Sequence, residues 1–192
     1  MVDKQGGTDR DVVSRIGKAR AAFIMLKNIW ASKKISQATK IRLFNSNVKS
    51  ILLYGSETWR TTATMTHKLQ TFVNTRLRRI FNIRWPERIC NEDLWKMGVQ
   101  EPVNQQIRRR KWGWIGHTLR KSTTSTTRQA LLWNPQGRRK RGRPRNSWRR
   151  DTDTELRERE TNWSEMEKAA QNRVRWRIVV DGLCFSQRGD KG

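Results

Sequence analysis

The chain has no carboxylate between Glu101 and Asp151. Within that interval, residues 103–150 contain 15 Lys and Arg side chains. A solvated helical face normally mixes signs, because opposite charges three or four residues apart attract each other. This stretch has no such partners, and its like charges repel each other in a compact state unless a polyanion neutralises them. The pattern therefore favours a surface that faces phosphate groups over an ordinary solvated one.

The rest of the chain is less basic but adds to a net charge of +25, from 42 Lys and Arg against 17 Asp and Glu. Residues 1–60 have 12 basic and 4 acidic side chains, residues 61–102 have 7 and 4, and residues 151–192 have 8 and 9. Nucleic acid is the usual partner of so basic a chain, because each neutralised phosphate releases counterions. An anionic membrane surface is the rival. We expect RNA, RNA–DNA hybrid or DNA as the partner, with no membrane and no small-molecule substrate.

The two cysteines, Cys90 and Cys184, lie far apart, and no secretory signal opens the sequence. Both features favour reduced thiols in a nuclear or cytoplasmic protein. No apolar run approaches the roughly 20 residues of a membrane span. The cysteines and the two histidines, His67 and His117, lack the paired spacing of a zinc site, so no metal or other cofactor is expected.

Catalytic motifs are equally absent from the sequence. No Ser or Cys has a nucleophile motif around it. Asp151, Asp153 and Glu155 form the densest group of carboxylates, and a two-metal nuclease would need such acids in a fixed pocket. They precede a stretch rich in Glu and Arg, where acids favour the start of a helix. We therefore expect no enzymatic centre.

The hydrophobic periodicity is helical almost throughout. A first helix is expected from Asp9, capped at Thr8 or Asp9, and further helices over residues 36–54, 64–81, 91–97 and 103–119. Their inward positions are Val12, Ile16, Ala19, Phe23, Leu26 and Trp30; Ile41, Phe44, Val48, Ile51 and Leu52; Met65, Leu69, Phe72, Leu77 and Ile80; and Ile107, Trp114 and Ile115 or Leu119. Residues 122–127 are polar and aperiodic, which predicts a loop.

Residues 134–146 contain Pro135, Pro144 and a run of cations, and they should be disordered without a partner. A last helix is expected from the capping pattern Ser164-x-x-Glu167, through Met166, Ala170, Val174 and Ile178, to Asp181-Gly182. The class is mainly α. A helical bundle spans residues 1–121, a basic, partly disordered arm spans residues 122–146, and a C-terminal helical segment spans residues 147–192.

Two basic clusters are the candidate binding sites. In the arm, Arg141-Gly-Arg-Pro-Arg145 resembles an AT-hook, since Pro keeps the backbone extended and A·T minor grooves attract Arg. The same letters fit general phosphate binding or a nuclear-localisation signal. On the helix expected over residues 103–119, four consecutive cations precede Trp112 and Trp114, which either stack on bases or pack in a core around Gly113. The expected phosphate contacts are Arg108, Arg109, Arg110, Lys111, Arg138, Arg139, Lys140, Arg141, Arg143, Arg145, Arg149 and Arg150.

Several phrases together resemble the C-terminal region of non-LTR (LINE-type) retrotransposon reverse transcriptases. They are, in order, Gly6-Gly-Thr-Asp9, Arg15-Ile-Gly-Lys-Ala-Arg20, Leu52-Leu-Tyr-Gly-Ser-Glu-Thr-Trp59, Arg110-Lys-Trp-Gly-Trp-Ile-Gly-His117, Gly142-Arg-Pro144 with Trp148, and Arg175-Trp-Arg177 with Asp181-Gly-Leu183. Their order and spacing extend over nearly the whole chain. The resemblance implies thumb helices over about residues 9–80, which grip a template–primer duplex, followed by a basic C-terminal extension.

The resemblance also implies what this chain lacks. The family's polymerase centre needs a pair of adjacent aspartates in the palm, and the sequence has no Asp-Asp. The family's N-terminal endonuclease is missing, and two cysteines cannot form the zinc knuckle of some relatives. We expect a non-catalytic fragment that holds RNA template or RNA–DNA hybrid by its backbone, with a reverse transcriptase palm as a second candidate partner. The alternatives are a chromatin-binding remnant that uses the AT-hook-like segment and a truncated product without activity.

Overall fold

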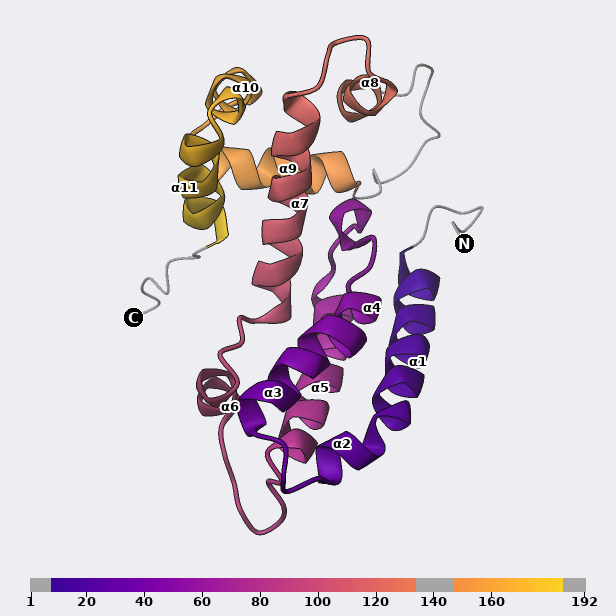
Figure 1. Ribbon diagram of the computed structural model, residues 1–192. Coiled ribbons are helices and arrows are strands. Elements are labelled where there is room, and N and C mark those ends of the chain that lie inside the picture. Colours follow the sequence, from indigo (N-terminus) through magenta and orange to yellow (C-terminus); the bar gives the residue numbers. More distant parts are fainter. Residues whose placement is uncertain (1–7, 134–146, 185–192) are drawn as a thin grey trace. The chain divides into compact units, whose positions relative to one another are not determined.

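The computed structural model describes residues 8–133 and 147–184, and every regular element within them is a helix (Figure 1). The mainly α class predicted from the sequence is confirmed. The chain divides into two compact units. Unit 1 comprises Met1–Gly55 and Thr61–Asn104, and unit 2 comprises Ser56–Arg60 and Gln105–Gly192.

Unit 1 consists of α1 (Asp9–Met25), α2 (Lys27–Ala31), α3 (Gln37–Leu43), the π-helical η1 (Phe44–Lys49), α4 (Ser50–Leu52), α5 (Ala63–Ile80) and α6 (Asn91–Met97). Its core is built around aromatic contacts. The Phe23 ring stacks on Trp30, with centroids 5.0 Å apart, and meets the Phe44 ring edge to face at 6.3 Å. Such pairs stabilise a core beyond their buried area.

The expected apolar stripe of α5 is confirmed, because all five of its inward positions are buried. The N-cap of α5 is Thr62, whose side chain accepts a hydrogen bond from the Met65 amide. The helix expected over residues 36–54 is present as α3, η1 and α4 in succession. It begins at the cap Ser36 and ends before Gly55, where φ is 75°. In α1, by contrast, Ile16 is only half-buried.

Unit 2 contains the 3₁₀ turn η2 (Ser56–Thr58), most of α7 (Val103–Leu119), α8 (Thr126–Leu132), α9 (Trp148–Arg157), α10 (Trp163–Gln171) and α11 (Arg173–Cys184). Trp112 is fully buried among these helices, and its ring lies 6.3 Å from Trp176 and 6.4 Å from Trp163. The boundary between the units therefore lies near the start of α7. The sequence had placed all of residues 1–121 in one region.

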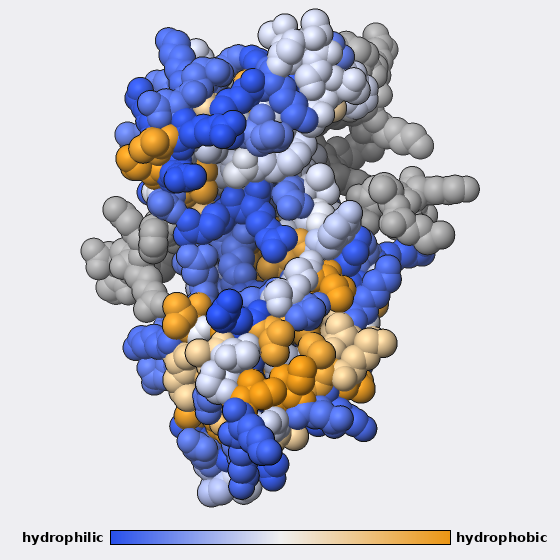
Figure 2. Space-filling model, in the orientation of Figure 1, coloured by the Kyte–Doolittle hydropathy of each residue, from blue (hydrophilic) through white to orange (hydrophobic). Residues whose placement is uncertain are grey.

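Two expectations for unit 2 are wrong. Residues 126–132 form α8, although the sequence predicted a loop through residue 127. The single C-terminal helix is two helices, because Asn172 adopts an extended backbone after α10 and its side chain accepts hydrogen bonds from the amides of Val174 and Arg175. The break rotates the face that points inward. Val174 and Ile178 are 68% and 69% exposed, and Figure 2 shows an apolar patch over α11.

The close approach expected at Gly113 occurs instead at Gly116. A Cβ atom built on Gly116 would lie 2.0 Å from Nε1 of Trp176, whereas one on Gly113 would meet nothing within 4 Å. The buried Trp176 ring thus packs directly on the backbone of α7, where it donates a hydrogen bond to the Trp112 carbonyl at 3.2 Å. Only glycine fits at position 116.

Two chemical features of the described residues bear on function. None of their helices is both long and apolar enough to cross a membrane. No three His, Cys, Asp or Glu side chains among them are grouped in a way that could hold a metal ion.

Candidate nucleic-acid interface

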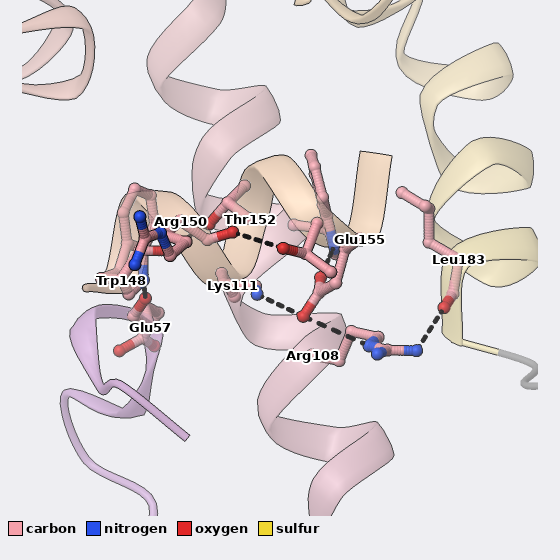
Figure 3. A network of polar contacts seen from close by, with 10 residues as sticks. Glu57, Arg108, Lys111, Trp148, Arg150, Thr152, Glu155 and Leu183 are labelled. Atoms are coloured by element: carbon pink, nitrogen blue, oxygen red, sulfur yellow. Dashed lines mark hydrogen bonds and ion pairs between the residues drawn. The ribbon is translucent and has the colours of Figure 1, made fainter. Parts of the chain in front are cut away.

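The four consecutive cations predicted to contact phosphate lie on α7, and three of them pair with carboxylates from the C-terminal helices. Arg108 Nε lies 3.5 Å from Oε1 of Glu155 on α9, and its guanidinium donates to the Leu183 carbonyl (Figure 3). Arg109 forms an ion pair with Asp181 on α11. Arg110 is half-buried. Ion pairs with carboxylates distant in sequence therefore neutralise part of the positive charge of α7, which has no acidic residue of its own.

Lys111 is the clearest correction among these residues. Its Nζ atom donates to Oε1 of Glu155 at 2.6 Å, and only 4% of its side chain is exposed (Figure 3). The second oxygen of Glu155 accepts from Nε1 of Trp112 at 2.7 Å. A buried, paired ammonium group is inaccessible to a phosphate. Lys111 is thus a structural residue of unit 2 and not the phosphate contact that the sequence predicted.

Glu155 and its neighbouring acids also differ from expectation, since they lie within α9 and not ahead of a helix. The N-cap is Ser147, whose side chain accepts from the Arg150 amide. Asp153 accepts from Nε1 of Trp163 at 2.8 Å. Glu155 and Asp153 therefore bind indoles and cations of unit 2, as expected of structural residues.

The two predicted cations on α9 have different environments. Arg149 is half-buried and donates to the Leu131 carbonyl of α8 at 3.1 Å. Arg150 is exposed, so its side chain is accessible to a phosphate, as expected from the sequence. The remaining predicted contacts, Arg138, Arg139, Lys140, Arg141, Arg143 and Arg145, lie outside the described residues.

A basic groove in unit 1 is the site that sequence reasoning missed. It has a volume of about 890 Å³ and is lined by α2, the start of α3, the segment between them, the last turns of α5 and the segment that follows. Seven of its sixteen lining residues are cations and none is acidic. The cations are Lys27, Lys33, Lys40, Arg76, Arg78, Arg79 and Arg84.

Three of the groove cations are held by the fold. Lys40 is buried, and its Nζ atom donates to the Trp30 carbonyl at 2.9 Å. Arg76 packs over the Phe72 ring at 5.0 Å, and burial, followed by the charges of Arg20 and Arg79, lowers the pKa of its guanidinium. Arg78 donates to the Ile89 carbonyl and to Asn91. These residues give the groove a fixed, positively charged wall.

The other four cations, which we call the rim cations, are Lys27, Lys33, Arg79 and Arg84. All four are exposed, and within the described part of the chain none pairs with a carboxylate. Hydrophilic side chains cover this end of unit 1 in Figure 2. Cations that lack acidic partners beside a concave surface raise the local potential and attract a polyanion.

The end of α5 determines where Arg84 is placed. The Ile83 amide donates to the Arg78 carbonyl at 2.9 Å and the Asn82 amide to the Arg79 carbonyl at 3.3 Å, which is the hydrogen-bond pattern of a Schellman motif. Asn82 supplies the left-handed residue that this motif needs, with φ of 58°. The chain therefore reverses sharply and brings Arg84 back to the groove.

No sequence motif identifies the groove. Its cations are single residues spread from Lys27 to Arg84, in segments whose basic excess is modest. A weak signal was the absence of any acid from residue 12 to residue 56, which covers α2 and α3. The arrangement can hold a chain of phosphates by charge, and backbone contacts of this kind carry no base specificity.

Part of the chain matches a family model, and most of it is similar to a transposon-derived protein. Residues 22–54, from the last turn of α1 to the second residue after α4, match a family model described as a domain of unknown function (DUF6451). The chain is 29% identical over 177 residues to an uncharacterized transposon-derived protein of Caenorhabditis elegans. The match covers 84% of this chain and 61% of the relative, so the chain spans about three fifths of that protein's length. No solved structure matches.

Proposed function

We propose that this chain is a non-catalytic nucleic-acid-binding region of a LINE-type retrotransposon reverse transcriptase, and that it holds RNA template or RNA–DNA hybrid by the backbone. The observation that carries the proposal is the basic groove of unit 1, which has seven cations and no carboxylate in its lining. The similarity to a transposon-derived protein supports a retroelement origin. The resemblance of the sequence to the reverse transcriptases supplies the finer assignment.

Binding by charge follows from the rim cations. Each phosphate that a Lys or Arg neutralises releases counterions, so the logarithm of the affinity falls linearly with the logarithm of salt concentration. The slope is about −0.9 per contact on a duplex and about −0.7 on a single strand. Because phosphate contacts do not read bases, the affinity should depend little on sequence.

Fluorescence anisotropy across a salt series tests the proposal. The ligands are RNA–DNA hybrid, single-stranded RNA, and AT-rich and GC-rich duplex DNA. Replacing Lys33, Arg79 and Arg84 with Ala should flatten the slope by about 2 to 3, since three contacts are lost. The control replaces Lys18, Arg42 and Lys68, which are exposed cations of unit 1 outside the groove. It removes the same charge and should leave the slope nearly unchanged.

The outcomes separate the proposal from its rivals. Equal flattening by both triple variants would mean that only the net charge matters, and the groove would not be the site. A strong preference for AT-rich duplex would favour the AT-hook-like segment as the reader of DNA. Negligible binding to all four ligands would contradict a nucleic-acid function.

A further inference from the structure

A tryptophan follows the groove in sequence and is directed to solvent. Trp85 is 79% exposed, and it comes directly after the rim cation Arg84. Among the described tryptophans only Trp133 is comparable, at 65%. An indole contributes a large apolar area when a partner covers it, so this exposed ring is available for a stacking contact.

The Trp85 ring lies on a segment with defined anchors at both ends. The Schellman motif at Asn82 sets where it begins, and hydrogen bonds from Arg78 to the Ile89 carbonyl and to Asn91 set where it ends. Between them the Glu87 amide donates to the Arg84 carbonyl at 2.8 Å, which closes a turn around Trp85. The ring is thus presented by an ordered turn, and a partner would not have to order the segment first.

Cations flank the ring on both sides in sequence. The Arg88 guanidinium lies 5.2 Å from the centroid of the Trp85 ring, within cation–π range, and Arg84 lines the groove. An aromatic ring beside cations that track a phosphate backbone is the arrangement with which proteins bind unpaired bases. In a continuous duplex the faces of the bases are covered by their neighbours, so a ring of this kind has nothing to stack on.

We propose that Trp85 stacks on an unpaired base of a strand whose phosphates lie in the basic groove. This inference rests on the proposed function and narrows its ligand to single-stranded nucleic acid or the unpaired end of a hybrid. The rim cations bind the phosphates of the strand. The base that stacks on Trp85 must be unpaired and must not be stacked on its neighbours.

The test compares an oligonucleotide of uridines with an abasic phosphodiester oligomer of the same length and charge. The wild-type protein should bind the base-bearing strand about 5- to 10-fold more tightly, since stacking is lost without bases. The variant Trp85→Ala should bind both oligomers alike while its salt slope stays unchanged. Trp85→Phe should keep part of the preference, because phenylalanine retains a ring.

The control is Tyr54→Ala. Tyr54 is 66% exposed in unit 1 and has a cation, Arg15, 4.7 Å from its ring centroid, but it does not line the groove. This variant should keep the full preference. If Trp85→Ala discriminates between the two oligomers as the wild type does, the stacking inference is wrong even though groove binding stands. If the Lys33, Arg79 and Arg84 triple variant retains the full salt slope, the groove itself is not the site.

Discussion

The Nζ atom of Lys111 lies 2.6 Å from Oε1 of Glu155 inside unit 2, although the two residues are 44 positions apart in the sequence. Glu155 also accepts from Nε1 of Trp112 and lies 3.5 Å from Nε of Arg108. One carboxylate of α9 therefore contacts three residues of α7, namely Arg108, Lys111 and Trp112. Such a pair contributes to the stability of the fold only while both partners are present, since a lone buried charge is strongly unfavourable.

Replacing Glu155 with Ala should destabilise unit 2. The change leaves the Lys111 ammonium buried without its carboxylate, and losses of this kind are about 3–5 kcal/mol. Native-state hydrogen exchange of amides in α7 and α9 would measure it, because it reports local stability without assuming two-state unfolding of the whole chain. The control Glu158→Ala removes an exposed carboxylate at the end of the same helix and should change stability by less than about 0.5 kcal/mol. Equal effects of the two variants would show that Glu155 has no special role.

Replacing the two glycines of α7, Gly116 and Gly113, with alanine should change the stability of unit 2 in opposite directions. Gly116→Ala should destabilise unit 2 by about 1–3 kcal/mol, because its Cβ would collide with the buried Trp176 ring. Gly113→Ala should stabilise it by about 0.5–1 kcal/mol, because alanine is the better helix former and its Cβ meets nothing. Denaturant unfolding followed by tryptophan fluorescence would separate the two. A stabilising Gly116→Ala would contradict the packing of Trp176 on the helix backbone.

Much of the helical architecture follows from periodicity, because each helix needs one apolar stripe. The bounds of α6 and α7 agree with those expected, and α5 differs by one residue at each end. Periodicity does not predict the break at Asn172, because the stripe of Met166 and Ala170 continues in register to Val174. An Asn side chain that caps a new helix ends the old one, and a pattern of apolar spacing does not register that change.

The candidate site was less predictable than the fold. Local charge counting found the stretch 103–150 but could not foresee that Glu155 and Asp181 would return to pair with it. It also gave no weight to isolated cations such as Lys33 and Arg79, which only the packing of α2 against α5 brings to one groove. Tertiary structure pairs some clustered cations with distant carboxylates and brings some isolated cations together. The net charge of a sequence segment predicts neither effect.

The arm and the groove should contribute separately to the salt dependence. Replacing Arg138, Arg139, Lys140 and Arg141 with Ala should flatten the slope by up to about 4 on a duplex, one unit per lost contact. Combining these changes with the Lys33, Arg79 and Arg84 triple variant should give the sum of the two effects, because each phosphate contact releases its own counterions. Anisotropy across the same salt series measures both. A quadruple variant with an unchanged slope would remove the arm from the interface.

Replacing Lys111 should affect the stability of unit 2, and replacing Arg150 should affect nucleic-acid binding. Lys111→Met removes a buried charge-assisted hydrogen bond to Glu155, which should lower the stability of unit 2 by about 1.5–3 kcal/mol. It should leave the salt slope unchanged, because the ammonium group does not reach solvent. Arg150→Ala removes an exposed cation and should do the reverse, with a slope flatter by about 0.9 on a duplex and stability within about 0.5 kcal/mol. Both variants are measured by hydrogen exchange and by salt-dependent anisotropy at a temperature where each is folded. If Lys111→Met flattens the slope as Arg150→Ala does, its ammonium group contacts phosphate after all, and the ion pair with Glu155 must open when nucleic acid binds.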